Sequence, residues 1–443
     1  MTQSIHLGLT AMWLFQTLIS FLSQAIVAAY FGTGANLDAY LVGTTIPTTI
    51  YMIVSTGLGA AAIVYFNQVK ARAGKSEACE KIGGVAVAAS MISVLMAIFI
   101  FGAADELIEL FTPGLSSEVH QKAVACLRIT APSLPFIVLL CLLTGLLQAE
   151  GHFYITSLAS ILFVGLVPLP VLISEQISSE SLALGFDLSA TGSCLFLLGT
   201  SISKQLITNG RVQWVEWKYL VALSAPAFTA ACFTHGMWLV ERYLASSLHP
   251  GAISALNYGQ RIINFLAGGL TFVTATTLLP HLSLWLESGE KGAAAAFNRR
   301  AMLLTTIFAI AGTLSLAVGG EWLVRLAFAR GEFDEAAVGL TTTAMYLYIG
   351  VFVGYLFSVV LGRNALAVNE GKMMVASSST LFIAYLAVAP VLQKTLSFQG
   401  LALAASVAWV LSFSVYFYGM HRKYPFLYVQ EARNSLNTRV SKA

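Results

Sequence analysis

Charged residues are scarce in this sequence. Of its 443 residues, 10% are Asp, Glu, Lys or Arg and 57% are hydrophobic, whereas soluble domains usually contain about 25% charged residues. The mean hydropathy is +0.78. An ordinary soluble protein is therefore excluded. The apolar residues instead form runs of about 20, the length that crosses a bilayer as a helix.

Cysteine is also scarce, and motifs of nucleotide or metal chemistry are absent. Cys79 lies in a predicted loop, and the other cysteines lie in apolar runs (Cys126, Cys141, Cys194 and Cys232). Neither a disulfide framework nor the spacing of a metal site is predicted. The sequence has no Walker loop, dinucleotide fingerprint, HExxH or GxSxG motif. We therefore expect no cofactor, no metal and no ATP-driven step.

The apolar runs predict an all-α polytopic membrane protein with about twelve transmembrane helices. No basic segment precedes the first run, which is too long for the apolar part of a signal peptide, so it is expected to remain as the first helix. With an even number of crossings, both termini lie on the same side. The predicted helices are 8–31, 39–66, 82–103, 122–148, 153–173, 188–208, 219–245, 253–285, 302–321, 338–362, 372–392 and 400–420.

The distribution of basic residues predicts which side is cytoplasmic. The connections on one side and the tail at 421–443 hold 17 of the 24 Lys and Arg residues, and the opposite connections are acidic or bare, as at 105–118 and 175–187. Basic connections mark the cytoplasmic side. The net charge of +3 therefore reflects topology, no nucleic-acid partner is expected, and the tail is predicted to contact lipid headgroups. The 17 residues are Lys70, Arg72, Lys75, Lys81, Lys204, Arg211, Lys218, Lys291, Arg299, Arg300, Arg363, Lys372, Arg422, Lys423, Arg433, Arg439 and Lys442.

An internal repeat predicts two lobes. DAYLVG at 38–43 resembles SALNYG at 254–259, and each opens the second long helix of a six-helix half. Small-residue stretches follow at 56–60 and 267–270. We expect an N-terminal lobe at 1–210 and a C-terminal lobe at 211–420, facing each other across a central cavity. The small residues have a second interpretation, because they also let membrane helices pack closely.

Several motifs resemble those of one known family. They are YFGTGANLDAY at 30–40 followed by Pro47, LRITAP at 127–132, ERYLAS at 241–246, ISALNY at 253–258 with Arg261, and RGEF at 330–333. Together they resemble the MurJ/MviN family of the multidrug/oligosaccharidyl-lipid/polysaccharide exporter superfamily. The resemblance implies a flippase of the bacterial cytoplasmic membrane. It would carry an undecaprenyl-diphosphate-linked glycan from the inner to the outer leaflet by alternating access, in contact with membrane lipids and glycan-synthesis enzymes.

Two departures from this family bear on the cargo. Members that move the peptidoglycan precursor usually carry arginines along the first two helices, and they tend to have fourteen helices rather than the twelve predicted here. Few cations suit a head group with few negative charges. We therefore expect a surface-polysaccharide repeat unit rather than lipid II, the peptidoglycan precursor. The residues in place of those arginines are Gln16, Thr17, Ser23, Gln24, Tyr51 and Met52.

Arginine suits a lipid diphosphate, because its planar fork donates two hydrogen bonds to phosphate oxygens and keeps its charge. Arg261, eight residues into the predicted eighth helix, is the first candidate ligand. Its alternative role is a structural ion pair with Asp38 or Glu241. Arg128, six residues into the predicted fourth helix, and Arg242 are further candidates. For these two, the alternative is an interfacial position at the outer membrane surface.

Polar residues are expected to line the path of the sugar. Asn257, Gln260 and Asn264 recur at spacings of three and four, which places them on the helical face that carries Arg261. Gln24 is a further candidate on the first helix. Polar stripes of this kind can equally hold membrane helices together.

Two acidic residues are candidates for gating and coupling. Asp38 either stabilises the start of its own helix or pairs with Arg261 or Arg242 of the other lobe when the outer side is closed. Protonation of Asp38 or Glu241 would assist the return of the empty carrier. Outward movement of about two negative charges is downhill by roughly 4.6 kcal/mol per 100 mV of inside-negative potential, so no coupled ion is required.

Three other classes of function are compatible with twelve helices. A drug–cation antiporter of the same superfamily would have acidic residues in the N-terminal lobe and no basic cavity. A polyprenyl-sugar glycosyltransferase would carry paired acidic residues in the first external loop, whereas Asp105 and Glu106 lie in the second. A scaffold without transport activity would lack a polar cavity. The sequence favours a transporter over an enzyme.

Overall fold

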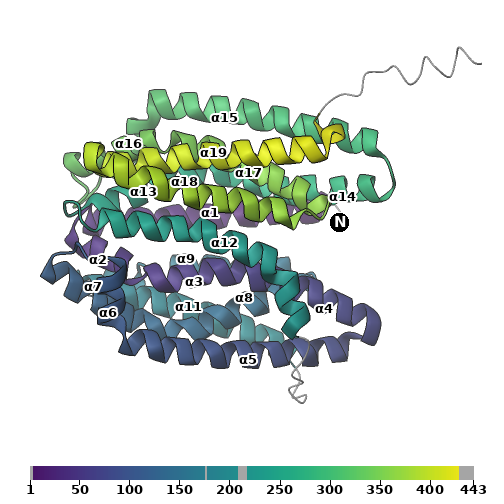
Figure 1. Ribbon diagram of the computed structural model, residues 1–443. Coiled ribbons are helices and arrows are strands. Elements are labelled where there is room, and N and C mark those ends of the chain that lie inside the picture. The colour runs from purple at the N-terminus through teal and green to yellow at the C-terminus, as the bar shows by residue number, and fades with distance from the viewer. Residues whose placement is uncertain (1–2, 175–176, 208–216, 429–443) are drawn as a thin grey trace, which may run out of the picture.

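The computed structural model describes residues 3–174, 177–207 and 217–428, and every regular element in these ranges is helical (Figure 1). The N-terminal elements are α1 (Gln3–Phe31), α2 (Ala35–Gly43), α3 (Thr45–Val54), η1 (Ser55–Gly59), α4 (Ala60–Ala73), α5 (Lys75–Gly102), α6 (Ala104–Phe111), α7 (Ser117–Thr130), η2 (Ala131–Ser133), α8 (Leu134–Ala149), α9 (Phe153–Gly165), α10 (Leu169–Ile173) and α11 (Ser179–Ser203). The C-terminal elements are α12 (Trp217–Ala245), α13 (Ala252–Val273), η3 (Thr274–Leu278), α14 (Leu279–Glu287), α15 (Lys291–Phe328), α16 (Glu335–Leu347), α17 (Ile349–Ala367), α18 (Gly371–Leu396), α19 (Phe398–Lys423) and η4 (Pro425–Leu427).

The predicted all-α membrane fold is confirmed. Helices lie at all twelve predicted positions, and several predicted helices consist of consecutive elements, such as α2, α3, η1 and α4. Among the described residues, nine helices are long and apolar enough to cross a membrane. Large hydrophobic side chains are exposed along α5 and α15, at the two outer edges in Figure 1, where lipid would cover them (Ile92, Leu95, Phe99, Leu303, Leu314 and Val318).

Several predicted helix boundaries are wrong. The third helix, α5, begins at Lys75 rather than at 82, so Cys79 is helical rather than in a loop. The sixth helix, α11, begins at Ser179 rather than at 188, because the Ser178 hydroxyl accepts a hydrogen bond from the Ser181 amide (3.2 Å) and caps the helix. Asp187 therefore lies two turns inside α11 and not in a loop. The ninth helix, α15, is 38 residues long, so Arg299 and Arg300 are helical rather than in a connection. These starts were predicted too late in the sequence, because the first turns of these helices contain polar residues of the kind that is typical of loops.

The helices divide into two groups in Figure 1. Elements α2 to α11 form the lower group, α13 to α19 form the upper group, and α12 runs between them and packs against α3 and η1. Helix α1 packs mainly against α9. The predicted lobe boundary at residues 210 and 211 lies outside the described residues, and the division at 1–210 and 211–420 stays a prediction. For description, α1–α11 are the N-terminal half and α12–α19 the C-terminal half.

One end of the molecule, called the basic end below, carries matching loops in the two halves. Glu150 in AEGHF (149–153) pairs with Lys70 at 2.6 Å and Lys75 at 2.8 Å. Glu370 in NEGKM (369–373) pairs with Lys423 and accepts a hydrogen bond from the Tyr424 hydroxyl (2.8 Å). These loops lie at like positions in the two halves, which extends the internal repeat.

The charges at these loops favour ionised carboxylates. Burial alone raises the pKa of Glu150, but the hydrogen bonds and charges of Lys70 and Lys75 outweigh this effect and hold its pKa below the usual value. The hydrogen bond from Lys423 and that from Tyr424 lower the pKa of Glu370. Both glutamates therefore stay negative at neutral pH and tie helix ends together within each half.

The start of the predicted basic tail is folded. Residues 421–423 continue α19, and η4 packs against α15, where the Asn298 side chain donates a hydrogen bond to the Leu427 carbonyl (3.0 Å). Residues 429–443, which include Arg433, Arg439 and Lys442, lie outside the described residues.

Candidate functional site

The two halves meet at the end of the molecule opposite the basic end, called the Asp38 end below. Asp38 is buried in the first turn of α2. Its carboxylate accepts hydrogen bonds from the Gly251 amide (2.6 Å), the Ser254 amide (2.8 Å) and the Ser254 hydroxyl. Gly251 precedes α13 with φ of 90°, a conformation that favours glycine. Asp38 therefore caps a helix of the other half, where the positive end of the helix dipole favours an anion.

A second contact closes the same end. The Glu332 amide in the α15–α16 connection donates a hydrogen bond to the Ala29 carbonyl near the end of α1 (2.9 Å). Gly32 and Gly331 both have positive φ, and a Cβ atom on either would collide with the backbone of the other half. The two glycines therefore allow the halves to approach closely.

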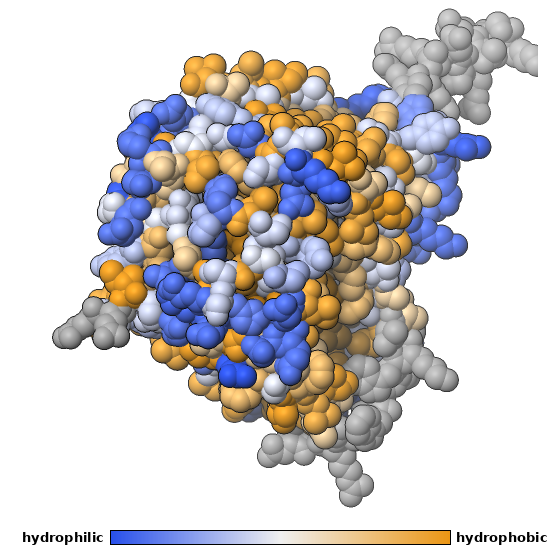
Figure 2. Space-filling model, turned by 60° about the vertical axis from the view of Figure 1, so that its left-hand side comes forward, coloured by the Kyte–Doolittle hydropathy of each residue, from blue (hydrophilic) through white to orange (hydrophobic). Residues whose placement is uncertain are grey.

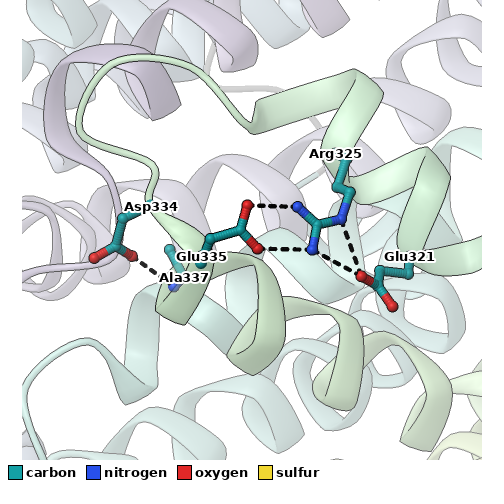
Figure 3. A network of polar contacts seen from close by, with 5 residues as sticks. All are labelled: Glu321, Arg325, Asp334, Glu335 and Ala337. Atoms are coloured by element: carbon teal, nitrogen blue, oxygen red, sulfur yellow. Dashed lines mark hydrogen bonds and ion pairs between the residues drawn. The ribbon is translucent and has the colours of Figure 1, made fainter.

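Exposed charges hold the connection that makes this contact (Figure 3). Arg325 at the end of α15 pairs bidentately with Glu335 at 2.6 and 2.7 Å and also bonds Glu321 at 2.9 Å. Asp334 accepts a hydrogen bond from the Ala337 amide (2.8 Å) and caps α16. Figure 2 turns this end toward the viewer and shows hydrophilic residues gathered on it, with hydrophobic residues at its top and bottom.

Glu241 and Arg242 lie near the C-terminal end of α12. Glu241 is buried and accepts hydrogen bonds from the hydroxyls of Tyr348 (2.9 Å) and Tyr385 (3.5 Å). Arg242 interacts electrostatically with Glu241, with Arg261 and with Asp38. Its Nη1 atom is buried and has no hydrogen-bond partner among the described residues. A buried guanidinium nitrogen without a partner is costly and is suited to an anionic ligand.

A small cavity of about 20 Å³ brings four of the predicted site residues together. This volume holds about one water molecule. The cavity is lined by Trp238, Glu241, Arg242, Ala245, Ile253, Leu256, Asn257 and Gln260. Asn257 and Gln260 of the predicted polar face of α13 therefore lie beside α12 at this cavity, whereas Arg261 and Asn264 do not line it.

Arg261 lies one turn along α13 from this cavity. It is exposed, its Nε atom donates a hydrogen bond to Asn257 Oδ1 (3.4 Å), and it interacts electrostatically with Tyr40 and Tyr258. No ion pair joins Arg261 to Asp38 or Glu241 in the part of the chain that the structure describes. The alternative of a structural ion pair is therefore wrong, and Asp38 binds helix-terminal amides instead of an arginine.

Three predicted site residues lie apart from this cluster. Arg128 is the twelfth residue of α7, which begins at Ser117 rather than at the predicted 122, and it is exposed. Gln24 lies on α1 and is half-buried, and Asn264 is exposed on α13. None of the three lines the small cavity.

Comparison with known proteins decides the family. A model of the family described as lipid II flippase MurJ matches residues 27–441, which is nearly the whole chain. The chain belongs to the MurJ family. The resemblance stated from the motifs is therefore confirmed.

Relatives and solved structures agree with the MurJ assignment. A probable lipid II flippase MurJ of Rhizobium meliloti is 25% identical over 75% of this chain and 64% of its own length, and that of Vibrio cholerae is 22% identical over 93% and 81%. A lipid II flippase MurJ in an inward closed conformation superimposes with a TM-score of 0.82 at 18% identity, covering 94% and 87% of the two chains. An inward-facing multidrug resistance MATE transporter of the MOP superfamily superimposes with a TM-score of 0.74 at 15% sequence identity. This match covers 93% of the present chain and 95% of the transporter. These structural similarities show the fold.

Sequence reasoning missed the tyrosines of this MurJ family member. Tyr348 and Tyr385 bond Glu241, and Tyr40 and Tyr258 flank Arg261. Tyr40 and Tyr258 belong to the motifs that carried the family resemblance, which was an available signal. Tyr385 comes from α18 and has no such signal.

Proposed function

We propose that this protein is a flippase that moves a polyprenyl-diphosphate-linked glycan between membrane leaflets by alternating access. Membership of the MurJ family supports the class of function. The single observation that carries the assignment is the pair of neighbouring arginines, Arg242 and Arg261, beside the junction of the two halves. Arg242 offers a buried Nη1 atom without a partner.

These two arginines suit a diphosphate. Two neighbouring guanidinium groups repel each other, so a bound ligand with about two negative charges stabilises them both. Each planar fork can donate two hydrogen bonds to phosphate oxygens. Asn257 and Gln260 add neutral donors and acceptors on the same side, where the first sugar would follow the diphosphate.

Asp38 is the proposed gate. It joins α2 of one half to the start of α13 in the other, and the Asp38 end is closed by this contact and by the Glu332 amide. Outward opening requires these hydrogen bonds to break. Glu241, held by two tyrosine hydroxyls, is the proposed coupling residue, because it adjoins the arginine that would lose its ligand.

We place the protein in the bacterial cytoplasmic membrane with both termini in the cytoplasm. The basic end then faces the cytoplasm, in accord with the positive-inside rule, and the Asp38 end faces outward. A reporter fused after Ala443 should behave as cytoplasmic. In this orientation, transport of about two negative charges outward is favourable under the membrane potential.

A drug–cation antiporter is the second candidate, since the fold also superimposes on MATE transporters. It is disfavoured by the same arginine pair, because an organic cation would be repelled by Arg242 and Arg261. A glycosyltransferase is disfavoured by family membership.

Within the proposed class, the preference for a surface-polysaccharide unit over lipid II stays a prediction. The relatives are named for lipid II, whereas this chain has Gln16, Ser23, Gln24 and Tyr51 along the helices where such flippases usually have arginines.

Complementation tests both the function and the cargo. The chain is expressed in one bacterial strain depleted of its peptidoglycan-precursor flippase and in another that lacks its surface-polysaccharide flippase. We expect restored polysaccharide export in the second strain and lysis of the first. Rescue of the first strain with normal precursor translocation would contradict the cargo preference. Failure in both, with the protein correctly inserted, would contradict the flippase assignment.

A further inference from the structure

A larger cavity lies inside the N-terminal half, apart from the arginines. It has a volume of about 280 Å³ and is formed by α3, η1, α4, α8 and α9. Its size is close to the lower limit of usual ligand pockets, so it fits one small ring rather than a peptide. Ser55, one of its lining residues, is exposed. The lining residues are Tyr51, Ser55, Gly59, Ile63, Leu140, Cys141, Thr144, Gly145, Gln148, Ala159, Ser160 and Phe163.

This cavity combines an aromatic wall with free polar groups. The rings of Tyr51 and Phe163 stack with their centroids 5.2 Å apart. Thr144 and Gln148 lie one turn apart on α8, and neither side chain makes a hydrogen bond to another described residue. Ser160 faces them from α9 and bonds only the Thr156 carbonyl of its own helix (3.1 Å). Hydroxyl and amide groups are therefore available to a ligand.

The chemistry of this lining selects the class of ligand. It contains no Asp, Glu, Lys, Arg or His, so neither a phosphate nor an organic cation would find a counter-charge. A lipid tail would leave the Thr144 hydroxyl and the Gln148 amide without hydrogen bonds, which is costly away from water. A neutral polyhydroxylated ring satisfies the polar groups and covers the aromatic wall.

The η1 segment shapes the cavity. Residues Ser55–Gly59 form a π-helical turn, and both end residues of this turn line the cavity. π-Helical turns are frequent at functional sites. A Cβ atom on Gly145 would lie 2.7 Å from the Gly59 carbonyl oxygen, so the glycine lets α8 approach this turn.

Tyr40 and Tyr51 lie between the arginines and the cavity. Tyr40 interacts electrostatically with Arg261, and Tyr40, Tyr51 and Phe163 pack in one cluster with Ile137 and Phe186. Tyr40 and Tyr51 are eleven residues apart along α2 and α3, a separation of about 16 Å at a rise of about 1.5 Å per residue. A head group with more than one sugar could extend from one site toward the other.

We propose that this cavity is a binding subsite for an uncharged sugar ring of the transported glycan. The proposal rests on the proposed flippase function and names what the N-terminal half contributes to it. The arginines bind the diphosphate, and the cavity binds a neutral sugar through Thr144, Gln148 and Ser160. Selectivity for the glycan then resides in the N-terminal half.

Transport of two lipids by the reconstituted full chain tests the proposal. One lipid is a polyprenyl diphosphate that carries neutral sugars, and the other is the same diphosphate without sugar. Thr144→Val and Gln148→Leu remove the polar groups, and Thr200→Val is the matched control, because the Thr200 hydroxyl bonds its own helix at the Phe196 carbonyl (2.7 Å). Each lost hydrogen bond should lower transport of the sugar-bearing lipid at low concentration about 2- to 10-fold.

The same variants should move the bare diphosphate like the wild type, and Thr200→Val should leave both lipids unaffected. If the double variant Thr144→Val/Gln148→Leu moves the sugar-bearing lipid at the wild-type rate, or loses both lipids equally, the subsite is refuted. If the wild type moves neither lipid, the flippase function itself fails.

A binding measurement keeps the subsite testable without transport. Ser160→Cys places a thiol in the cavity. Cys141 also lines the cavity, so Ser160→Cys is made in a Cys141→Ala/Cys232→Ala background, where the remaining cysteines, Cys79, Cys126 and Cys194, are buried. A neutral oligosaccharide at millimolar concentration should slow the reaction of the introduced thiol with a small maleimide several-fold. The oligosaccharide should not change the rate at which maleimide reacts with Ser203→Cys, a control at the exposed end of α11. Equal rates with and without the sugar would contradict the subsite.

Discussion

At the scale of single residues, the site depends on how few charges are present. Arg242 and Arg261 are neighbours without an ion pair to Asp38 or Glu241, whose partners are Ser254, Gly251 and two tyrosines. Carboxylates that are already satisfied leave the guanidinium groups available. This arrangement supports the proposed role of the two arginines as ligands of an anion.

Arg261 therefore has a specific substitution profile. Arg261→Lys keeps the charge but loses the bidentate fork, and we expect transport to fall about 10- to 100-fold, in line with about 1.5–3 kcal/mol for a hydrogen bond to a charged group. Arg261→Ala should abolish transport. Polysaccharide export in the complemented strain measures the effect.

Arg128→Ala is the matched control for Arg261, since Arg128 is also exposed on a membrane helix but lies on α7, apart from the pair of Arg242 and Arg261. It should retain export. The amount of folded protein is compared by size-exclusion chromatography. Normal export by Arg261→Ala would contradict the ligand role.

Motifs predicted some of these residues but not their partners. Asn257 and Gln260 could be predicted to lie on one face of α13, because helical spacing places residues three and four apart on the same side. Arg242 comes from α12, and spacing along α13 could not predict that it lines the same cavity. The partner of Asp38 could not be predicted, since backbone amides carry no sequence signal and Gly251 is 213 residues away. Arg128 was misplaced because the polar first turns of α7 had the composition of a loop.

At the scale of helices, the contact of α2 with α13 closes the Asp38 end, and we propose that it controls access there. The Asp38 carboxylate caps α13 across the junction, and the second helix of each half also contains a π-helical turn, at η1 and η3. The repeat predicted from 38–43 and 254–259 thus joins its two copies directly. The π-helical turns could not be predicted, because their composition also suits an ordinary helix.

A disulfide across this contact should block transport. A Cβ atom on Gly251 would lie 3.7 Å from Cβ of Thr33, which suits a disulfide. Oxidised Thr33→Cys/Gly251→Cys should be inactive because the Asp38 end cannot open, and a reductant should restore activity. The backbone of Gly251 has positive φ, so the cysteine there is strained.

The two single-cysteine variants are the controls for this disulfide, and oxidant should not affect their transport. The degree of cross-linking is read from gel mobility after proteolysis. Transport at the full rate by completely cross-linked protein would mean that this end does not open in the cycle.

At the scale of the whole molecule, hydrogen bonds of Asp38, Glu332 and Gly114 join the two halves at the Asp38 end, and α12 also packs against α3 and η1. The carboxylates of the basic end, Glu150 and Glu370, bond lysines within their own halves. Hydropathy predicted the positions and the order of the helices, because long apolar runs leave no alternative in a membrane. It could not predict the cavity behind Tyr51, which depends on how α8 and α9 pack around η1.

We propose that this chain moves a polyprenyl-diphosphate-linked glycan across a bilayer. The most direct measurement is the accessibility of a fluorescent lipid of this class to a membrane-impermeant quencher in vesicles that contain the purified protein. We predict that lipid of the inner leaflet reaches the quencher far faster in vesicles with the wild type than in vesicles with Arg261→Ala. The rate should rise further when a membrane potential favours movement of the anion. Equal quenching in wild-type, Arg261→Ala and protein-free vesicles would contradict the proposal.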